Sequence, residues 1–375
     1  MAAVGCGGLE RSRAANIVIN NLDPTGSGFN DPTAWTPTGG NSATTLGQAR
    51  LNAFQYAANF WGKYLYSTVT ITIDATFTNL TPCNAFSGVL GAAGTRTVHA
   101  DFGNTAPYPP PAPGTWYPQA LANAISGTDL APGSSDIIAK FNSNIGTSGC
   151  LSGLNWYYGL DGHAPGGTVD LVTILLHEFA HGLGFQTYEN VSTGALMAGS
   201  PDTFLRSLEL HGGTPSDFVS MTDAQRVAAN VGDPNLHWVG ANVLAEAGVI
   251  PLTAGIANGH VRMYGPSPVQ PGSSVSHYHT VLTPNELMEP VYTGPDRDLR
   301  MTLALLQDVG WQIIRPTLTI TKVRHGTVRI SWTGSGTLQQ KTSLPGTAWT
   351  DVAGNPSSPY ITGVTNVQKF FRVRF

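Results

Sequence analysis

The stretch HEFAHGLGF at residues 177–185 decides which fold and chemistry this sequence predicts. Residues four apart share one face of a helix, so the imidazoles of His177 and His181 can bind the same metal ion. Glu178, between them, supplies the base that a water molecule on such a metal needs. The stretch therefore predicts a helix that carries a metal site with a carboxylate beside it.

The residues around this motif predict a buried helix with one polar stripe. Most positions from 169 to 183 are apolar, whereas one stripe is polar or small and comprises Asp170, Thr173, His177, His181 and Gly184. Buried polar groups need partners, and a divalent cation with its water would satisfy them; hydrogen bonds from two core histidines to the backbone are the alternative. We expect the helix to span about 169–183, with a glycine at its end.

The third metal ligand must come from elsewhere in the chain, because a catalytic zinc site usually takes three protein ligands and leaves the fourth position to water. The segment 276–290, with the sequence SHYHTVLTPNELMEP, offers His277 and His279. If 276–280 were a strand, these two side chains would share one face, so periodicity cannot separate them. His237 is a third candidate.

Together these segments resemble the leishmanolysin branch of the metzincin zinc peptidases. Most metzincins place the third histidine three residues after the motif glycine, where this chain has Thr187. Leishmanolysin-like enzymes insert a subdomain there, and the gap from His181 to His277 fits such an insertion. The resemblance implies that His177, His181 and His277 bind one zinc ion and that Glu178 is the general base.

The resemblance also assigns roles after the third histidine. Met288, eleven residues after His277, would be the Met-turn residue beneath the metal, and a core methionine near a turn is the alternative. Some metzincins use a tyrosine soon after this turn, so Tyr292 is a candidate to stabilise the oxyanion; a half-buried structural tyrosine is the alternative. A calcium site has no support in the sequence.

Composition is consistent with a secreted protein. The chain has 375 residues, of which 11% are charged, and it contains 44 glycines and 26 prolines. The sequence contains no run of 18 apolar residues, so it predicts no membrane span. Residues 1–13 lack the apolar core of a signal peptide. Nothing resembles a nucleic-acid-binding motif. We therefore expect an extracellular protein whose signal peptide is not visible in this sequence.

Three cysteines constrain the N-terminal half. In an oxidising compartment Cys83 and Cys150 would pair, which leaves Cys6 without a partner. Some zinc peptidases are kept latent by a thiol on the metal, so Cys6 is a candidate for such a switch. An incidental cysteine in the N-terminal tail is the alternative.

The order of predicted elements agrees with an α+β, metzincin-like domain over residues 1–315, with an upper subdomain at about 15–184 and a lower one at about 185–315. Periodicity predicts the following elements: helices at 46–66, 119–125, 222–230 and 299–309, and strands at 68–77, 96–102 and 136–144. In a peptidase of this type, strand 136–144 is a candidate to pair with an extended substrate.

After Arg315-Pro316 the pattern changes to short strands. We expect them at 317–323, 327–332, 337–342, 348–352 and 369–375, which predicts a small all-β sandwich over 316–375 similar to fibronectin-like modules of bacterial enzymes. This region has seven Lys/Arg and one acidic residue, so its net charge is +6, whereas the remainder carries −10 (12 minus 22). A basic module could bind an anionic polymer or surface.

The sequence thus predicts a secreted zinc endopeptidase that hydrolyses protein or peptide substrates through a zinc-activated water. The alternative is a surface-binding or adhesive protein whose metal site is structural or inactive. Glu178 separates the two, because a structural metal site has no need for a carboxylate that does not bind the metal.

Overall fold

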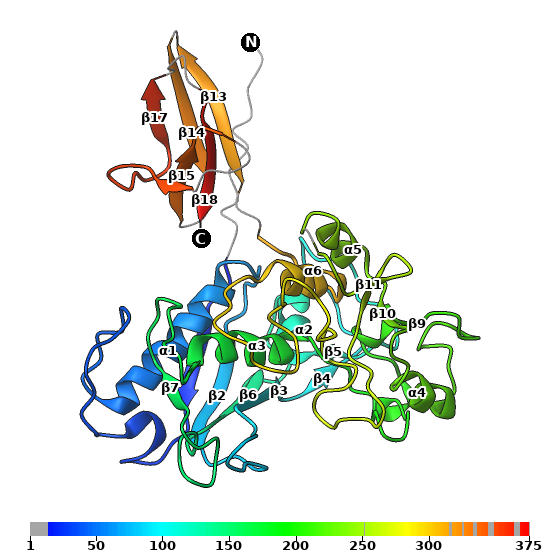
Figure 1. Cartoon of the computed structure of the whole chain (residues 1–375). Helices are drawn as coiled ribbons and strands as arrows, with labels where there is room; N and C mark the ends of the chain where they lie inside the picture. The colour runs from blue at the N-terminus through cyan, green and yellow to red at the C-terminus, as the bar shows by residue number, and fades with distance from the viewer. Residues whose placement is uncertain are drawn as a thin grey trace, which may run out of the picture. The chain divides into compact units, whose positions relative to one another are not determined.

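The structure is a computed structural model that describes residues 14–250, 252–314, 317–324, 326–332, 336–343, 349–363 and 368–374. The chain divides into two compact units, Met1–Ile313 and Ile314–Phe375 (Figure 1). The first unit is mixed α/β and the described part of the second consists of strands. The proposed boundary Arg315-Pro316 lies outside the described residues, next to this division.

A four-stranded sheet forms the centre of the first unit. Its order is β1-β2-β6-β3, in which β1, β2 and β6 are parallel and β3 is antiparallel to β6. The strands span Ile17–Asn21 (β1), Ile71–Thr78 (β2), Ile137–Asn142 (β6) and Gly91–Thr95 (β3). Because side chains alternate along a strand, Ile71, Ile73, Ala75 and Phe77 of β2 are all buried on one face.

Helices cover this apolar face (Figure 1). They are α1 (Leu46–Gly62), α2 (Gln119–Ser126) and α3 (Leu171–Leu183). Helix α3 packs so closely on the sheet that a Cβ atom at Gly182 would lie 2.5 Å from the Ile137 side chain. Two indoles also hold its backbone: Trp61 Nε1 donates to Leu176 O (3.2 Å) and Trp311 Nε1 donates to Leu183 O (2.8 Å). The helix that carries the histidines is therefore fixed within the core.

The edge of this sheet differs from the sequence-based expectation. The predicted strand 96–102 is only the short β4 (Val98–His99), which pairs with β5 (Tyr117–Pro118), whereas the edge strand is β3. Its sequence GAAGT lacks the apolar β-branched and aromatic residues that mark a strand. Strand β6 pairs on both sides, with β2 and β3, so the expectation that 136–144 would pair with substrate is wrong.

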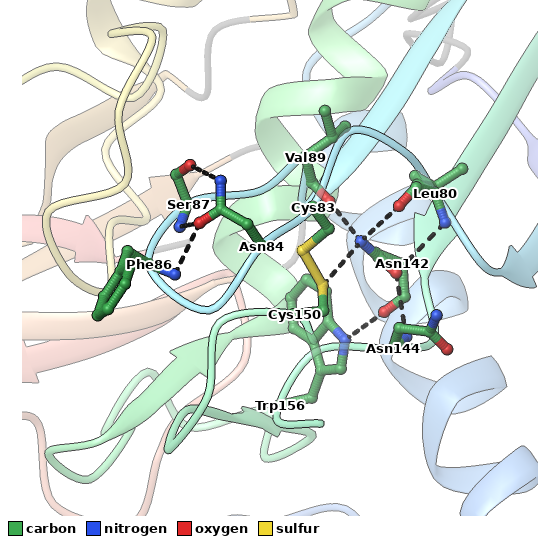
Figure 2. Close-up of a disulfide and its surroundings, with 10 residues drawn as sticks. All are labelled: Leu80, Cys83, Asn84, Phe86, Ser87, Val89, Asn142, Asn144, Cys150 and Trp156. Carbon is green, nitrogen blue, oxygen red and sulfur yellow. Dashed lines mark hydrogen bonds between the residues drawn. A yellow bond between two sulfur atoms is a disulfide. The ribbon is translucent and has the colours of Figure 1, made fainter. Parts of the chain in front are cut away.

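A disulfide connects the two loops that flank β3 and β6. Cys83, before β3, is bonded to Cys150, after β6, in the pairing expected from the sequence (Figure 2). Asn142 lies beside it and donates through Nδ2 to Leu80 O (3.3 Å) and Val89 O (2.8 Å). These contacts fix the position at which the chain enters β3. Cys6 lies outside the described residues.

A second sheet lies within the region between helix α3 and residue 276. Its order is β11-β12-β10-β9, and it consists of Leu208–Leu210 (β9), Leu236–Trp238 (β10), Ile256–Ala257 (β11) and His260–Arg262 (β12). Strands of two or three residues are too short for a period-2 pattern to predict them. Two helices of this region, α4 (Asp223–Ala229) and α5 (Ala241–Ala247), precede the closing helix α6 (Arg300–Asp308).

Helix α6 is joined to β10 and to the start of α5 through one carboxylate. Asp308 accepts hydrogen bonds from Trp238 Nε1 (3.0 Å), Asn242 N (2.8 Å) and Val243 N (3.1 Å). The remaining elements of the first unit are short: β7 (Asn155–Tyr157), β8 (Thr168–Asp170) and the 3-10 helices Gly28–Asn30, Met197–Gly199 and Leu205–Ser207. No helix among the described residues is long and apolar enough to cross a membrane.

The second unit contains two three-stranded sheets. One has the order β13-β14-β17 and the other β16-β15-β18. Their strands are Leu318–Arg324 (β13), Thr327–Trp332 (β14), Thr337–Lys341 (β15), Thr350–Asp351 (β16), Tyr360–Gly363 (β17) and Phe370–Arg374 (β18). A small core joins them, formed by Ile330, Trp332, Leu338 and Val352. Strand β17 was not predicted from the sequence.

Candidate metal centre

Three imidazole nitrogens from distant parts of the chain meet at one point. His177 Nε2 lies 3.1 Å from both His181 Nε2 and His277 Nε2, and the last two are 3.2 Å apart. His181 and His277 are buried and His177 is partly buried. These three residues form a group that could hold a metal ion. The structure therefore brings together the three ligands that the family resemblance implied.

The other ring nitrogen of each histidine fixes its tautomer. Nδ1 of His177, His181 and His277 lies 2.8, 2.7 and 2.8 Å from the carbonyl oxygens of Leu287, Phe185 and Ser273, respectively. A carbonyl oxygen only accepts, so each Nδ1 carries the hydrogen and each Nε2 is left with its lone pair. A cation between the three lone pairs would relieve their mutual repulsion.

Burial keeps these rings neutral. It lowers the pKa of His177 to about 4 and that of His181 to about 3, and it lowers the pKa of His277 well below its ordinary value. A neutral imidazole is the form that binds metals. The site is therefore in its ligand form near neutral pH.

The spacing of the nitrogens matches a four-coordinate metal. Tetrahedral coordination with metal–nitrogen bonds of about 2.0–2.1 Å separates two ligand nitrogens by about 3.3–3.4 Å. The observed separations of 3.1–3.2 Å differ from this by only a few tenths of an ångström. The residues present thus fit a metal with three imidazole ligands and one open position.

The glycine after helix α3 places the hydrogen-bond partner of His181. Gly184 has φ = 121°, a conformation that side chains disfavour, and its N–H caps the helix at Ala180 O and His181 O. The chain then turns back, so that Phe185 N donates to Ala180 O (2.9 Å) and Phe185 O reaches His181 Nδ1. A residue with a Cβ atom at position 184 would be strained at this φ, and its Cβ would lie 3.1 Å from Pro118 Cγ.

The predicted Met-turn supports the site through its backbone. Leu287 O accepts the hydrogen bond of His177, and the next carbonyl, that of Met288, accepts from Tyr278 N (2.9 Å). Met288 is fully buried. The turn therefore connects the helix ligand to the segment that carries His277. The predicted position of the Met288 side chain beneath the metal stays a prediction.

The two alternative ligands lie in other surroundings. His279 Nε2 is 3.1 Å from Asp233 Oδ1, and His237 Nε2 is 3.0 Å from Pro234 O. The two histidines of this segment contact different partners, and residues 276–280 do not form a regular strand: within the described residues only position 278 forms a bridge, with Met263. The structure thus selects His277, which periodicity could not do.

Glu178 lies between helix α3 and the edge strand. Its side chain is buried, and Oε2 accepts a hydrogen bond from Ala93 N of β3 (2.9 Å). Burial raises its pKa to about 8, and the Ala93 hydrogen bond opposes this rise. Among the described residues no hydrogen bond reaches its other oxygen. One carboxylate oxygen is held by the sheet, and the other remains to interact with a small molecule.

Tyr292 has a structural position. Its hydroxyl accepts a hydrogen bond from Asp170 N (3.0 Å) at the N-terminus of α3. Asp170 precedes His177 by seven residues, which is about 10 Å along a helix axis. The hydroxyl thus supports the helix terminus. The oxyanion role that the resemblance suggested stays a prediction.

An ion pair between the buried Asp170 and the partly buried Arg297, not predicted from the sequence, fixes the start of the same helix. Asp170 is fully buried and caps α3 by accepting from Thr173 N (2.9 Å). Arg297, after the Met-turn, donates to Asp170 Oδ2 and to Thr173 Oγ1. The two partners are 127 residues apart, so no local pattern in the sequence connects them.

Loss of Arg297 should destabilise the first unit. In Arg297→Ala the carboxylate of Asp170 stays buried without its charged partner, which typically costs about 3–5 kcal/mol. Denaturant unfolding of the full chain measures this change. Arg300→Ala is the matched control, because Arg300 pairs with Asp298 at exposed positions and should cost less than about 1 kcal/mol. Equal losses in the two variants would show that the Asp170 pair is not critical.

Comparison with known proteins adds no assignment to this geometry. No family model matches the chain, and no curated protein or solved structure matches it either.

Proposed function

We propose that this chain is a secreted, zinc-dependent endopeptidase. One observation carries the proposal: three neutral imidazoles converge with Nε2 separations of 3.1–3.2 Å, and Glu178, the residue that follows His177 in the sequence, is held beside an edge strand. Imidazole ligands favour transition metals over calcium or magnesium, and zinc is the most common metal of such three-histidine sites. The donor set supports zinc in preference to the alternatives.

The number of ligands supports a catalytic site. Structural zinc sites are closed by four protein ligands, whereas catalytic sites keep one position for water or substrate. Among the described residues, the group around helix α3 contains His177, His181 and His277 and no fourth ligand. Glu178 supplies a carboxylate next to the ligand His177 but outside this group. Hydrolysis requires such a carboxylate, whereas a structural site does not require one.

Glu178 would move the proton during hydrolysis. When bound, zinc polarises the scissile carbonyl and makes a water molecule more acidic. Glu178 accepts the proton of the attacking water and then donates it to the leaving amine as the C–N bond breaks. The hydrogen bond from Ala93 N orients the carboxylate for this task.

The outer edge of β3 favours a peptide as the substrate. Ala93 N donates to Glu178 and therefore points away from β6. Because the backbone groups of successive residues point to alternate sides of a strand, the peptide groups of Gly91 and Thr95 face the same outer side as Ala93. An extended peptide can pair with such an edge through its backbone. This pairing would place the scissile bond near Glu178.

The disulfide and the composition support secretion. Disulfides such as Cys83–Cys150 persist mainly in oxidising compartments, and the low charge content suits an extracellular protein. The substrate is then an extracellular protein or peptide. The second unit, with its net positive charge, would hold the enzyme near an anionic surface or polymer.

Metal removal tests this function. Purified protein should hydrolyse casein, and treatment with EDTA followed by dialysis should reduce the rate at least about 100-fold, because the metal contributes several kcal/mol to catalysis. Addition of zinc should restore the rate, whereas calcium should not. Full activity of the metal-free protein would contradict a zinc peptidase.

A further inference from the structure

The second sheet carries a cluster of metal-binding residue types on one face. In its register His237 of β10 lies opposite Glu209 of β9 on one side and Arg262 of β12 on the other. Because side chains alternate, His211 and His260, two residues from Glu209 and Arg262, fall on this same face. The opposite face is apolar and buried, with Leu208, Leu236, Trp238 and Val261.

The polar atoms of this cluster lie close together. His211 Nδ1 is 3.2 Å from Glu209 Oε1, and His260 Nδ1 is 3.4 Å from Glu209 Oε2. Glu209, His211 and His237 offer ligand atoms that all lie within 4.8 Å of one another. The His260 ring is also near, with its centroid 5.9 Å from that of His237. One carboxylate and two imidazoles therefore lie close together, and His260 lies beside them on the other oxygen of Glu209.

His237 has a buried ring nitrogen without a hydrogen-bond partner in the described part of the chain. Its side chain is 0% exposed, and its Nε2 donates to Pro234 O (3.0 Å). Nε2 therefore carries the hydrogen, and Nδ1 must be an acceptor. This Nδ1 is buried and has no hydrogen-bond partner among the described residues. A buried acceptor without a partner costs free energy, which a cation at this point would remove.

We propose that Glu209, His211 and His237 bind a second zinc ion, with His260 as the fourth ligand. Imidazole and carboxylate together suit zinc, and four protein ligands make a closed, structural site. The nearby charge of Arg262 does not oppose the ion strongly, because its guanidinium pairs with Asp233 on the side of His279.

Such an ion would join three strands that are each only three residues long. It would link β9, β10 and β12. The residues directly after β12 pair with the segment that contains His277: Met263 bridges to Tyr278, and Tyr264 N donates to His277 O (2.9 Å). The second ion would thus stabilise the framework that presents His277. The inference does not depend on peptidase activity.

The competing explanation is a cluster of protonated histidines paired with Glu209 without metal. Metal-free full-length protein, dialysed against micromolar zinc at neutral pH and measured by elemental analysis, distinguishes the two. We expect two zinc ions per chain in the wild type and one in His211→Asn, with at least tenfold weaker binding of the second ion. His237→Gln should behave like His211→Asn. His163→Asn is the matched control, because His163 is exposed and paired only with Asp161.

The exposed position of His211 keeps the test decisive, since its replacement should leave the fold intact even if the buried His237 variant does not fold. His181→Asn should also retain one zinc ion, in the second site. The proposal would be overturned if the wild type bound only one zinc ion and His181→Asn bound none. Two zinc ions retained in His211→Asn would overturn it as well.

Discussion

Glu178→Gln should abolish peptide hydrolysis while the metal stays bound. Glutamine has the shape of glutamate and can still accept the hydrogen bond of Ala93 N, but it cannot accept a proton from water. General acid–base catalysis contributes about 10²–10⁴-fold, so we expect the rate of casein hydrolysis to fall by about 10³-fold or more. Hydrolysis and zinc content should be measured on the same preparation.

The control is Glu189→Gln, the same change at another buried carboxylate. Glu189 is outside the three-histidine group and accepts a hydrogen bond from Asn230 Nδ2 (2.8 Å), which the amide oxygen of glutamine can also accept. This variant should keep its activity. A Glu178→Gln protein with full zinc content and more than a tenth of the wild-type rate would contradict the assignment of Glu178 as the base.

His277→Ala should remove the metal from the centre and with it the activity. Two imidazoles on helix α3 hold an ion far more weakly than three, and even the loss of a residue that only orients a ligand costs about 10–100-fold in metal affinity. We therefore expect more than about 100-fold weaker zinc binding at this site and no measurable hydrolysis. Zinc titration of the metal-free protein, with activity at each step, measures both.

His279→Ala is the matched control for this variant. His279 lies two residues away, is similarly buried, and contacts Asp233 instead of the helix histidines. Its loss should leave zinc binding at the centre and hydrolysis unchanged. Activity in His277→Ala together with its loss in His279→Ala would reverse the assignment of the third ligand.

The helix and two of its ligands could be predicted because the relevant physics is local. Apolar residues at helical spacing predicted a helix at 169–183, and the structure has it at Leu171–Leu183. Residues 169–170 belong instead to β8, where Asp170 also caps the helix. His177 and His181 share a face through the helical period alone.

The third ligand and the edge strand depend on contacts that no local pattern encodes. His277 and His279 are equivalent by periodicity, and only their tertiary contacts separate them: His277 meets the helix histidines, whereas His279 meets Asp233. Strand β3 consists of glycine, alanine and threonine, so it becomes a strand only through its pairing with β6. Arg297 meets Asp170 across 127 residues.

The second histidine cluster shows the same limit. His211, His237 and His260 are spread over 50 residues without the spacing of a known metal motif. The register of β9, β10 and β12 brings them to one face, and strands of three residues are too short to be recognised from sequence. Sequence alone identified His237 only as a competing ligand for the first site.

Anomalous diffraction at the zinc K-edge, from crystals of the full-length protein grown with zinc, tests the central claim most directly. The account predicts a strong peak about 2.0–2.1 Å from Nε2 of His177, His181 and His277, with the Glu178 carboxylate outside the ligand set. The absence of a peak there, or a peak bound by Glu178 in place of one imidazole, would contradict it.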